Sequence, residues 1–539
     1  MPIQRTLIAS AVLSALAPLS APALAQAEEK TLPAVVVTAT PFTRDESAQI
    51  LTPVKVLAGP ELRNKLGISL GDTLSHELGV SASGFGAGAS RPIIRGQEGP
   101  RVKILQNGMA VSDVSSLSND HAVATDASTA RQIEILRGPA ALLYGSGAIG
   151  GLVNVVNERI PTELVPKSSG EAELRLGSAD REKGLSFSAD GAAGSIGLHL
   201  DGSTRDTGDY RIPGFAVIDD PSSASGRLPS SFTRAHNLGF GLSQIADWGH
   251  VGASIDTRKD DYGIPTEEKS FIDLRQTRAD IDGLIRAPFA AAEFFRFKIG
   301  STDYKHTEKE EDGTPATDFR NKAVETRWEV THRPLAGWRG SFGLQTEHGK
   351  FSALSVESGR PDAVPVTKSS SLAAFLVEER DFGPLRASAG LRAESVKRRP
   401  QETGLAERSF DLHSWSVGGL WSFMRGYGFG ATFSVAQRAP AVEELYSNGP
   451  HESTATFDIG DAALQKETSR NLELTLQKTE GLIRWKANLY ENRVRNYIFG
   501  RNDGTTVDED GNEDVAGEFT RRFWSQAKAT IRGAEAELG

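Results

Sequence analysis

Two residues that could bind a metal ion, Asp120 and His121, stand side by side in a polar segment from Leu117 to Asp126. A carboxylate and an imidazole are oxygen and nitrogen ligands of the kind that hold Zn²⁺ and related ions. The chain has 10 histidines and 70 acidic residues, so such neighbours also arise by chance in solvated loops. With three Met and no Cys, soft ligands are scarce, which disfavours Cu(I).

Enzyme motifs are absent from the sequence. The glycine-rich run from Gly145 to Gly151 resembles a phosphate-binding loop, but it lacks the Lys-Ser/Thr pair, and no long amphipathic helix follows. The sequence has no HExxH motif and no residues arranged like a Ser-His-Asp triad. It also has no pair of carboxylates that indicates catalysis more strongly than the strand pattern described below indicates a barrel. We therefore expect a protein that is not an enzyme and has no prosthetic group.

The composition restricts the class of protein further. A net charge of -10 argues against nucleic acid as a partner, and the lack of Cys fits an oxidising compartment. No apolar run after the N-terminal segment reaches the roughly 20 residues that a membrane helix needs. A membrane protein of this composition would have to be a closed β-barrel, because only a barrel satisfies its backbone polar groups without helices.

The first 25 residues have the pattern of a signal peptide. Arg5 supplies the positive start, Leu7 to Leu16 the apolar core, and Ala23 to Ala25 the small-residue cleavage site. Pro18 and Pro22 argue against the alternative of a buried helix. The sequence therefore predicts export, with a mature chain that starts at Gln26.

A β-branched run lies within a short leader at residues 26–41. The run consists of Leu32, Pro33, Ala34, Val35, Val36, Val37, Thr38, Ala39 and Thr40. Its residue types favour an extended strand near an exposed terminus, where it would lack a partner strand. From the residues alone it could equally be a stray edge strand.

Short helices and strands are predicted between residues 42 and 161. The spacing of Leu indicates helices over 61–66 and 69–74, with Ser69 as a possible cap, and Asn107-Gly108 is a strong turn signal. Strand-turn motifs then follow in order: Ile94-Arg95-Gly96, Arg101-Val102, and the stretch from Ile133 to Val156, which breaks at Arg137-Gly138-Pro139. By themselves these elements would also suit an ordinary soluble α+β domain.

In this order the motifs resemble the plug domain of TonB-dependent outer-membrane receptors. The resemblance implies that residues 42–161 form an α+β plug and that residues 32–40 are a TonB box. The box would pair by strand addition with TonB, which is energised by its inner-membrane complex. It also implies a location in the outer membrane, in contact with its lipid, and we expect a monomer.

From residue 171 to 539 the chain alternates apolar and polar residues with period two, as in Glu171 to Gly177 and Phe295 to Ile299. One lipid-facing and one lumen-facing phase is what the wall of an antiparallel transmembrane barrel requires. A β-sandwich would alternate too, but it offers no place for a plug. We expect extracellular loops at 206–234, 260–275, 305–322 and 446–466, and periplasmic turns at 246–249 and 334–337.

Barrels of this family have about 22 strands. The sequence ends at Ile531 to Gly539 within an alternating segment, so we expect a C-terminally incomplete barrel with two unpaired strand edges.

Within the family, the chain looks most like the zinc-uptake receptors of the ZnuD type. Carried over residue by residue, that resemblance implies a metal site made of Asp120, His121, Glu378 and His451. Glu378 alternates together with Arg380 and not with Phe375 and Val377, which predicts that Glu378 faces the polar lumen. Unlike many zinc-type relatives, the chain has no His in the loop at 262–269.

The expected function is TonB-dependent import of a scarce metal ion, with Zn²⁺ as the transported ligand, or of a metal chelate. A ferric-siderophore or haem receptor of the same family is the first alternative. Siderophore sites favour several aromatic residues at the plug apex, where residues 83–88 contain only Phe85. A surface receptor or adhesin without transport is the alternative from another class, and the box disfavours it.

Overall fold

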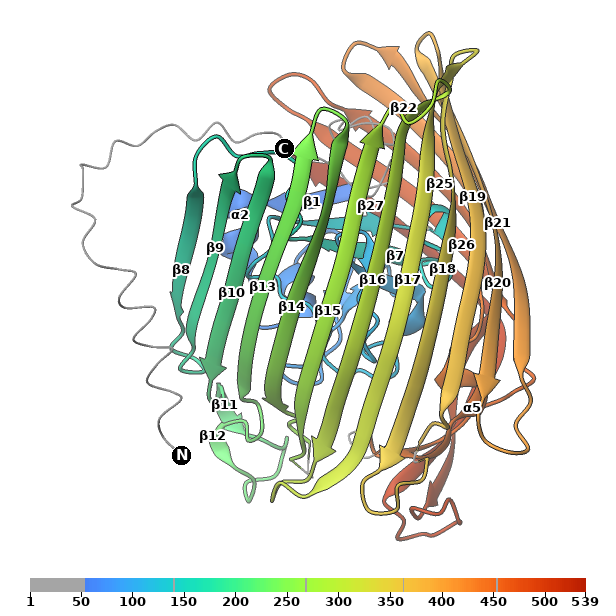
Figure 1. Ribbon diagram of the computed structural model, residues 1–539. Coiled ribbons are helices and arrows are strands. Elements are labelled where there is room, and N and C mark those ends of the chain that lie inside the picture. The colour runs from blue at the N-terminus through green and yellow to red at the C-terminus, as the bar shows by residue number, and fades with distance from the viewer. Residues whose placement is uncertain (1–53, 139–140, 267–268, 362, 452–453) are drawn as a thin grey trace, which may run out of the picture. The chain divides into compact units, whose positions relative to one another are not determined.

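The computed structural model describes residues 54–539, except 139–140, 267–268, 362 and 452–453. The predicted signal peptide and TonB box lie outside the described residues. The two largest sheets of the described chain are a five-stranded sheet near its N-terminus and a barrel sheet (Figure 1). In the described part of the chain, no helix is both long and apolar enough to cross a membrane.

The small sheet forms the plug and has five strands in the order β1-β6-β7-β4-β5. These are β1 (Val54–Ala58), β4 (Val102–Gln106), β5 (Met109–Ala110), β6 (Gln132–Arg137) and β7 (Gly151–Val156). All six residues of β7 are buried, since this apolar strand lies inside the sheet between β6 and β4. The paired strands β2 (Val80–Ala82) and β3 (Pro92–Ile94) and the 3-10 helix η2 (Gly99–Arg101) complete the plug strands and turns.

Three short helices accompany this sheet: α2 (Gly59–Lys65), α3 (Leu70–Leu74) and α4 (Ala141–Tyr144). The first two confirm the predicted helices, and the Ser69 side chain accepts a hydrogen bond from the Asp72 amide at 3.1 Å, as a helix cap does. The predicted turn is also confirmed. Asn107 and Gly108 have φ angles of 52° and 81°, which suit a tight hairpin between β4 and β5.

Eighteen strands of the described chain belong to the barrel sheet. Sixteen pair with their neighbours in antiparallel register: β8 (Ser169–Leu176), β9 (Lys183–Ala193), β10 (Ile196–Thr207), β13 (Thr233–Ala246), β14 (Gly249–Gly263), β15 (Phe271–Arg286), β16 (Ala292–Lys309), β17 (Pro315–Leu335), β18 (Trp338–Ser355), β19 (Thr367–Phe382), β20 (Leu385–Pro400), β21 (Arg408–Met424), β22 (Tyr427–Arg438), β25 (Glu467–Lys478), β26 (Trp485–Val507) and β27 (Phe519–Leu538).

The remaining two barrel strands are β23 (Asn448–His451) and β24 (Thr456–Ile459), which form a hairpin after the short helix α5 (Val442–Tyr446). β24 runs parallel to the start of β27, and Thr456 is opposite Thr520. A separate hairpin, β11 (Arg211–Phe215) with β12 (Ser225–Arg227), lies in the loop after β10. These elements extend one end of the barrel (Figure 1).

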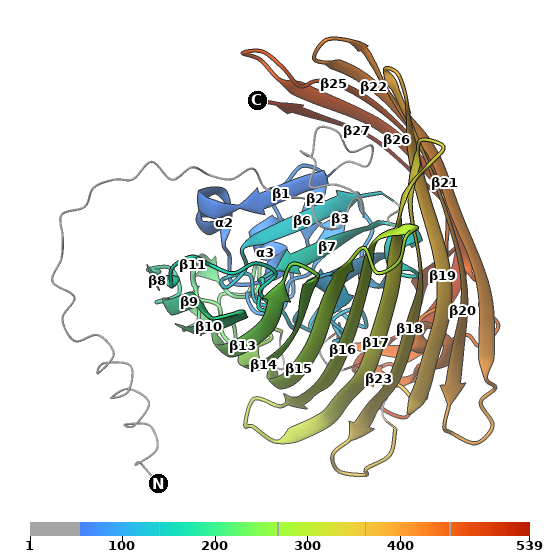
Figure 2. The same cartoon turned by 45° about the horizontal axis from the view of Figure 1, so that its top comes forward.

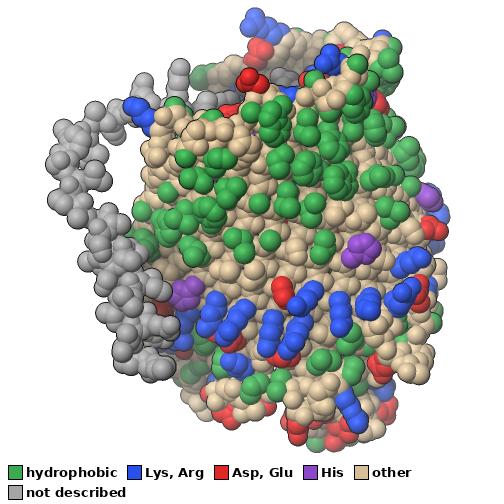
Figure 3. Space-filling model, in the orientation of Figure 1, with side chains coloured by type: hydrophobic (Ala, Val, Ile, Leu, Met, Phe, Trp, Pro, Cys, Tyr) green, Lys and Arg blue, Asp and Glu red, His purple; other side chains and the backbone are tan. Residues whose placement is uncertain are grey.

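The barrel wall presents apolar side chains outward and polar side chains inward. On β13, Leu238, Phe240 and Leu242 are exposed, whereas Asn237 and Ser243 are buried. On the face that Figure 3 shows, exposed apolar residues gather in a broad band across the wall. This alternation is the one predicted from the sequence, and it is the pattern that a lipid-facing wall requires.

The strands extend further than the sequence analysis predicted, because segments expected to be loops continue the alternation. The loop expected at 305–322 is reduced to the residues between β16, which ends at Lys309, and β17, which begins at Pro315. Likewise, β14 continues to Gly263 and β15 begins at Phe271. The turns at the opposite end, such as that between Leu335 and Trp338, are short as predicted.

The barrel strands curve around the plug (Figure 2), and one apolar cluster joins the two. Plug residues such as Ile94 and Val153 belong to the same cluster as Tyr262 and Tyr304 of the barrel. Ion pairs add to the contact, because Arg95 of the plug lies 2.9 Å from Glu473 and 2.8 Å from Glu535. The plug is thus held against the wall by both apolar packing and buried charge.

Candidate metal centre

The loop between β5 and β6 positions Asp120 and His121. Within it, the Asp113 carboxylate accepts hydrogen bonds from the Ser115 amide at 3.0 Å and the Ala124 amide at 2.8 Å. These bonds fix both sides of the segment that carries the two residues. Its apolar side chains, including Val114 and Val123, are buried in the cluster shared by plug and barrel.

Tyr262 of β14 attaches this loop to the barrel wall. Its hydroxyl accepts a hydrogen bond from the Ala122 amide at 2.9 Å and donates one to the Asp120 carbonyl at 3.2 Å. The backbone on both sides of His121 is therefore held by a single barrel side chain.

Strand β16 brings a carboxylate to the plug histidine. His121 Nε2 lies 3.0 Å from Glu308 Oε1 and 3.4 Å from Asp120 Oδ2. His306 lies two residues before Glu308 on the same inner face, and its Nε2 is 3.8 Å from Glu308 Oε1. The Tyr304 hydroxyl is 2.8 Å from His306 Nδ1, so the other ring nitrogen of His306 is directed at the carboxylate.

The hairpin β23–β24 supplies the fourth residue. His451 ends β23, and its Nε2 is 3.9 Å from Asp120 Oδ1. Its Nδ1 is 3.1 Å from the Thr454 hydroxyl, which orients the ring toward Asp120. Within the described residues, neither His451 Nε2 nor either Asp120 carboxylate oxygen has a hydrogen-bond partner.

Four possible ligand atoms thus meet at one point, one each from Asp120, His121, Glu308 and His451, all within 4.8 Å of one another. Ligands of a tetrahedral Zn²⁺ ion at about 2.0–2.1 Å lie about 3.3 Å apart, so small side-chain movements would close this set around an ion. The residues are buried, with 0, 1, 6 and 6% of their surface exposed, respectively.

Models of two protein families match the sequence around this centre. The TonB-dependent receptor plug domain matches residues 47–152, and the TonB-dependent receptor-like β-barrel matches residues 174–539. The chain belongs to the TonB-dependent receptors. It is accordingly an outer-membrane transport protein of a family whose members are transporters and receptors and are energised through TonB.

Relatives of this receptor carry different ligands according to their names. The vitamin B12 transporter BtuB of Vibrio vulnificus (strain CMCP6) is 24% identical over 454 residues, which are 83% of this chain and 69% of that protein. Among solved structures, the copper transporter OprC has a TM-score of 0.74 at 16% identity, covering 94% of this chain and 78% of its own.

A second solved structure is a double mutant of the Serratia marcescens hemophore receptor HasR in complex with its hemophore HasA and heme. It has a TM-score of 0.73 at 17% identity, covering 90% of this chain and 79% of its own. At these identities the structural likeness concerns the fold, so the cargo has to be inferred from the receptor's own residues.

Several other buried acids of the receptor are paired with arginines. Asp201, for example, is paired with Arg159 at 2.6 Å, and Glu467 with Arg101 and Arg438. In the described part of the chain, by contrast, the carboxylates of Asp120 and Glu308 form ion pairs only with histidines. A buried carboxylate needs a compensating charge, which here can come from protonated imidazole or from a bound cation.

Without an ion, the centre holds a proton. Burial alone lowers the pKa of His121, but the negative charge of Asp120 and the hydrogen bond to Glu308 outweigh it and raise this pKa to about 9. Burial raises the pKa of Asp120, but the imidazoles of His121 and His451 outweigh that effect and lower it. The metal-free centre is therefore an imidazolium held between carboxylates at neutral pH.

Glu378, which the sequence analysis included among the ligands, lies elsewhere. It shares the outward phase of β19 with Leu372 and Leu376, which are 57 and 37% exposed, whereas Phe375 is buried. Its Oε1 is 3.0 Å from His332 Nε2 near the short turns of the barrel. The prediction that it faces the lumen was wrong, because the even-numbered residues of this strand point to lipid.

Glu308 takes the place that was assigned to Glu378. The sequence analysis missed it because it fell within the loop expected at 305–322. The alternation itself contained the signal: Tyr304, His306 and Glu308 continue the inward phase of β16, while Lys305 and Thr307 alternate with them.

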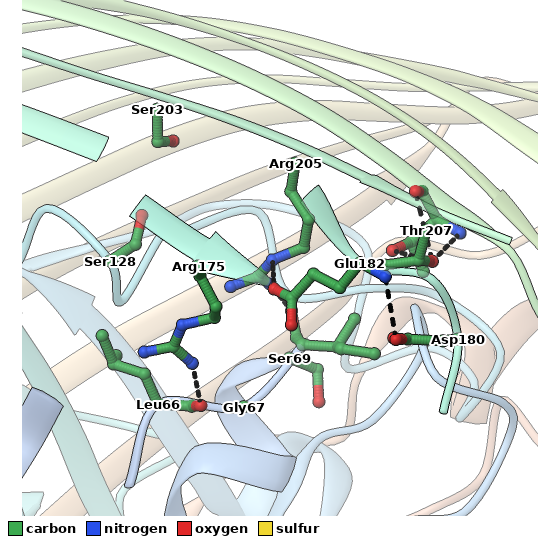
Figure 4. A network of polar contacts seen from close by, with 12 residues as sticks. Leu66, Gly67, Ser69, Ser128, Arg175, Asp180, Glu182, Ser203, Arg205 and Thr207 are labelled. Carbon is green, nitrogen blue, oxygen red and sulfur yellow. Dashed lines mark hydrogen bonds and ion pairs between the residues drawn. The ribbon is translucent and has the colours of Figure 1, made fainter. Parts of the chain in front are cut away.

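A second polar region of the receptor has its groups already paired. Between the plug and strands β8–β10, the Arg175 guanidinium donates to the Leu66 carbonyl, and Arg205 Nε lies 3.1 Å from Glu182 Oε1 (Figure 4). Basic and acidic groups satisfy one another there, so this region does not show the uncompensated charge found around Asp120.

Proposed function

We propose that the receptor imports a divalent transition-metal ion, with Zn²⁺ as its cargo, and that Asp120, His121, Glu308 and His451 bind it. The observation that supports this most strongly is the buried pair of carboxylates whose only ionic partners, among the residues that the structure describes, are imidazoles. A divalent cation would neutralise both acids and use the histidines as neutral ligands.

The ligand types favour zinc over softer ions. Two imidazoles and two carboxylates form the nitrogen and oxygen set typical of tetrahedral Zn²⁺ sites. Cu(I) prefers thiolate and thioether ligands, which this set lacks. Cu²⁺ binds strongly to the same donors, so selection between these two ions would depend on geometry and availability.

The burial of the ligands favours a bare ion over a chelate. All four residues expose at most 6% of their surface, which leaves no room for a siderophore, haem or corrin ring to contact them together. A ferric siderophore or haem would have to bind elsewhere in the barrel, and these cargoes remain the competing function of the same family.

The division of ligands between plug and barrel suggests how the ion is released. Asp120 and His121 belong to the plug, whereas Glu308 and His451 belong to the barrel. A displacement of the plug by a few ångströms would reduce four ligands to two on each side. TonB, acting through the box at residues 32–40, would supply that displacement, because the outer membrane has no ATP.

Metal binding by the purified receptor tests this proposal. We expect isothermal titration calorimetry to detect one Zn²⁺ site, with competition by Cu²⁺ and none by ferric siderophore or haem. Glu308→Gln should abolish high-affinity binding, whereas Glu378→Gln makes the same chemical change outside the centre and should leave binding intact. Two results together would contradict the proposal: tight binding of ferric siderophore or haem by the wild-type receptor, and a wild-type affinity for Zn²⁺ no higher than that of the Glu308→Gln variant.

A further inference from the structure

Outside the barrel, a row of basic side chains follows the edge of the apolar band (Figure 3). Its first half consists of Lys259, Arg275, Lys305 and Arg320, which are directly opposite one another across β14, β15, β16 and β17. Its second half consists of Lys322, Lys350, Lys368 and Arg399 across β17, β18, β19 and β20. All eight side chains are exposed. We call these eight residues the basic belt.

Direct cross-strand pairs of like charge are unfavourable in a sheet that lacks another partner. Here six such pairs follow one another over seven strands, which at about 4.8 Å per strand makes a row about 30 Å long. Six of the eight have an acidic neighbour within 4 Å, which offsets part of this charge; Lys259, for instance, lies 3.4 Å from Asp261, and Lys322 lies 2.7 Å from Asp303. Lys350 and Lys368 are opposite each other and form no ion pair in the described part of the chain.

The belt lies where the barrel leaves the apolar part of a membrane. On β17, the outward residues Val324 and Trp328 follow Lys322 into the apolar band, and on β19 Leu372 follows Lys368 in the same way. The belt is at the end of the strands that carries the longer loops and the hairpins β11–β12 and β23–β24. Longer loops mark the extracellular end of an outer-membrane barrel, so the belt faces the outer leaflet.

We propose that the basic belt binds the phosphate groups of a phosphorylated outer-leaflet glycolipid of the lipid A type. Lys and Arg at a membrane boundary extend their apolar stems along the acyl chains and place their charges at the level of the headgroups. Phosphates at that level would separate the opposed cations and neutralise Lys350 and Lys368, which have no acidic partner in the described part of the chain, and the length of the row allows several phosphates to bind side by side. This inference is independent of the cargo proposed above.

Native mass spectrometry of the full chain, folded in detergent and mixed with lipid A carrying two phosphates, tests the assignment. We expect the wild-type receptor to retain this lipid in preference to dephosphorylated lipid A and to phosphatidylglycerol, and to lose it as salt is raised, because salt screens exposed charges. The double substitution Lys350→Gln/Lys368→Gln should weaken retention by roughly fivefold per charge removed.

Two variants serve as controls. Lys350→Arg/Lys368→Arg keeps the charge and should retain the lipid. Arg425→Gln/Arg484→Gln removes two exposed charges at the short-turn end of the barrel and should have no effect. Circular dichroism and heat-modifiable gel mobility confirm folding; if the double Gln variant does not fold, the comparison of phosphorylated with dephosphorylated lipid on the wild type decides.

Three results would overturn the proposal. They are unchanged retention by a folded Lys350→Gln/Lys368→Gln variant, an equal loss in the Arg425→Gln/Arg484→Gln control, and wild-type binding that does not distinguish lipid A from its dephosphorylated form. A fourth result, equal binding of phosphatidylglycerol, would assign the belt to anionic lipid in general and would overturn the specific source named here.

Discussion

His121 of the plug and Glu308 of the barrel wall lie 3.0 Å apart, from Nε2 to Oε1, although 187 residues separate them in the sequence. The contact is buried and belongs to no helix or sheet ladder, so its geometry depends on how the plug sits against β16. The cation-binding centre proposed on this contact would respond to any relative motion of the two parts, which is what an importer requires of its cargo site.

Glu308→Gln tests the centre at its barrel side. Loss of one ligand should cost more than the 10- to 100-fold typical of partners that only orient a ligand, so we expect Zn²⁺ affinity to fall by about 100-fold or more. Calorimetric titration of the purified receptor measures it. Glu378→Gln is the matched control, since Glu378 lies outside the centre, and a similar loss in both variants would show that the charge effect is not local.

Zn²⁺ affinity should depend on pH through His121. The groups that face this imidazole are Asp120, Glu308, His306 and His451. Because the pKa of His121 is about 9 in the metal-free receptor, a proton must leave before the ring can bind a metal ion. Affinity should rise roughly tenfold per pH unit below pH 9, with about one proton released per ion at pH 7. Calorimetry in buffers of different ionisation enthalpy measures the release, and affinity that stays flat from pH 6.5 to 8.5 would be incompatible with it.

The same histidine should affect the stability of the metal-free receptor. Its pKa is raised from 6.5 in an unfolded chain to about 9 in the fold, so its stabilising contribution is complete below pH 6.5 and is lost as the pH rises through 9. We therefore expect the unfolding temperature of the metal-free wild type to decrease between pH 7 and 9.5 more than that of His121→Gln. Parallel decreases in both proteins would refute the assignment of this proton to His121.

Glu467→Gln should destabilise the contact between plug and barrel. Glu467 is fully buried, and its carboxylate accepts hydrogen bonds from Arg438 Nε at 2.8 Å and from Arg101 Nε at 3.2 Å. Removal of its charge leaves two buried guanidiniums short of a partner, a change that typically costs about 3–5 kcal/mol. Thermal unfolding in detergent, followed by circular dichroism, measures the loss.

Glu480→Gln provides the control for that substitution. Glu480 pairs with Arg425 at 3.0 Å on the surface, where both side chains are more than half exposed. Exposed pairs of this kind contribute about 0–1 kcal/mol, so the unfolding temperature should hardly change. If the two variants unfold together, burial does not determine the strength of these ion pairs.

Deletion of residues 32–40 should separate binding from transport. The segment was interpreted as the TonB box from its β-branched residues and its position before the plug. Cells that express the deletion variant should fail to accumulate radioactive Zn²⁺, while the purified variant binds the ion with unchanged affinity, because the segment contributes no ligand. Uptake at the wild-type rate would rule out this segment as the coupling element.

Sequence patterns that span only a few neighbouring residues predicted most of the fold. The alternation of the wall, the cap at Ser69 and the hairpin at Asn107-Gly108 are local features that a few neighbouring residues determine, and the structure confirms them. The limits of strands were harder to predict, because strands continue beyond the membrane wherever the polar residues still alternate. β16 and β17 extend in this way into a segment that was expected to be a loop.

The candidate centre was only partly predictable for the same reason. Asp120, His121 and His451 meet as the resemblance to zinc-uptake receptors implied, but the acidic partner depended on the phase of a strand. Around Glu378, apolar residues occupy both phases of β19, since Phe375 packs inward and Leu376 outward. The local sequence therefore does not show which face of β19 points inward. Only the burial of each side chain in the folded barrel shows it.

The hairpin that carries His451 pairs with β27 through β24, and β27 comes later in the chain than the hairpin. The position of His451 against Asp120 therefore depends on a strand that is synthesised after it. The order of assembly would thus have a chemical readout: before β27 joins the sheet, three of the four candidate donors are in place, and the fourth is fixed when β27 pairs with β24. Tight retention of a metal ion would then report that β27 has joined the sheet and could be used to time that step of assembly.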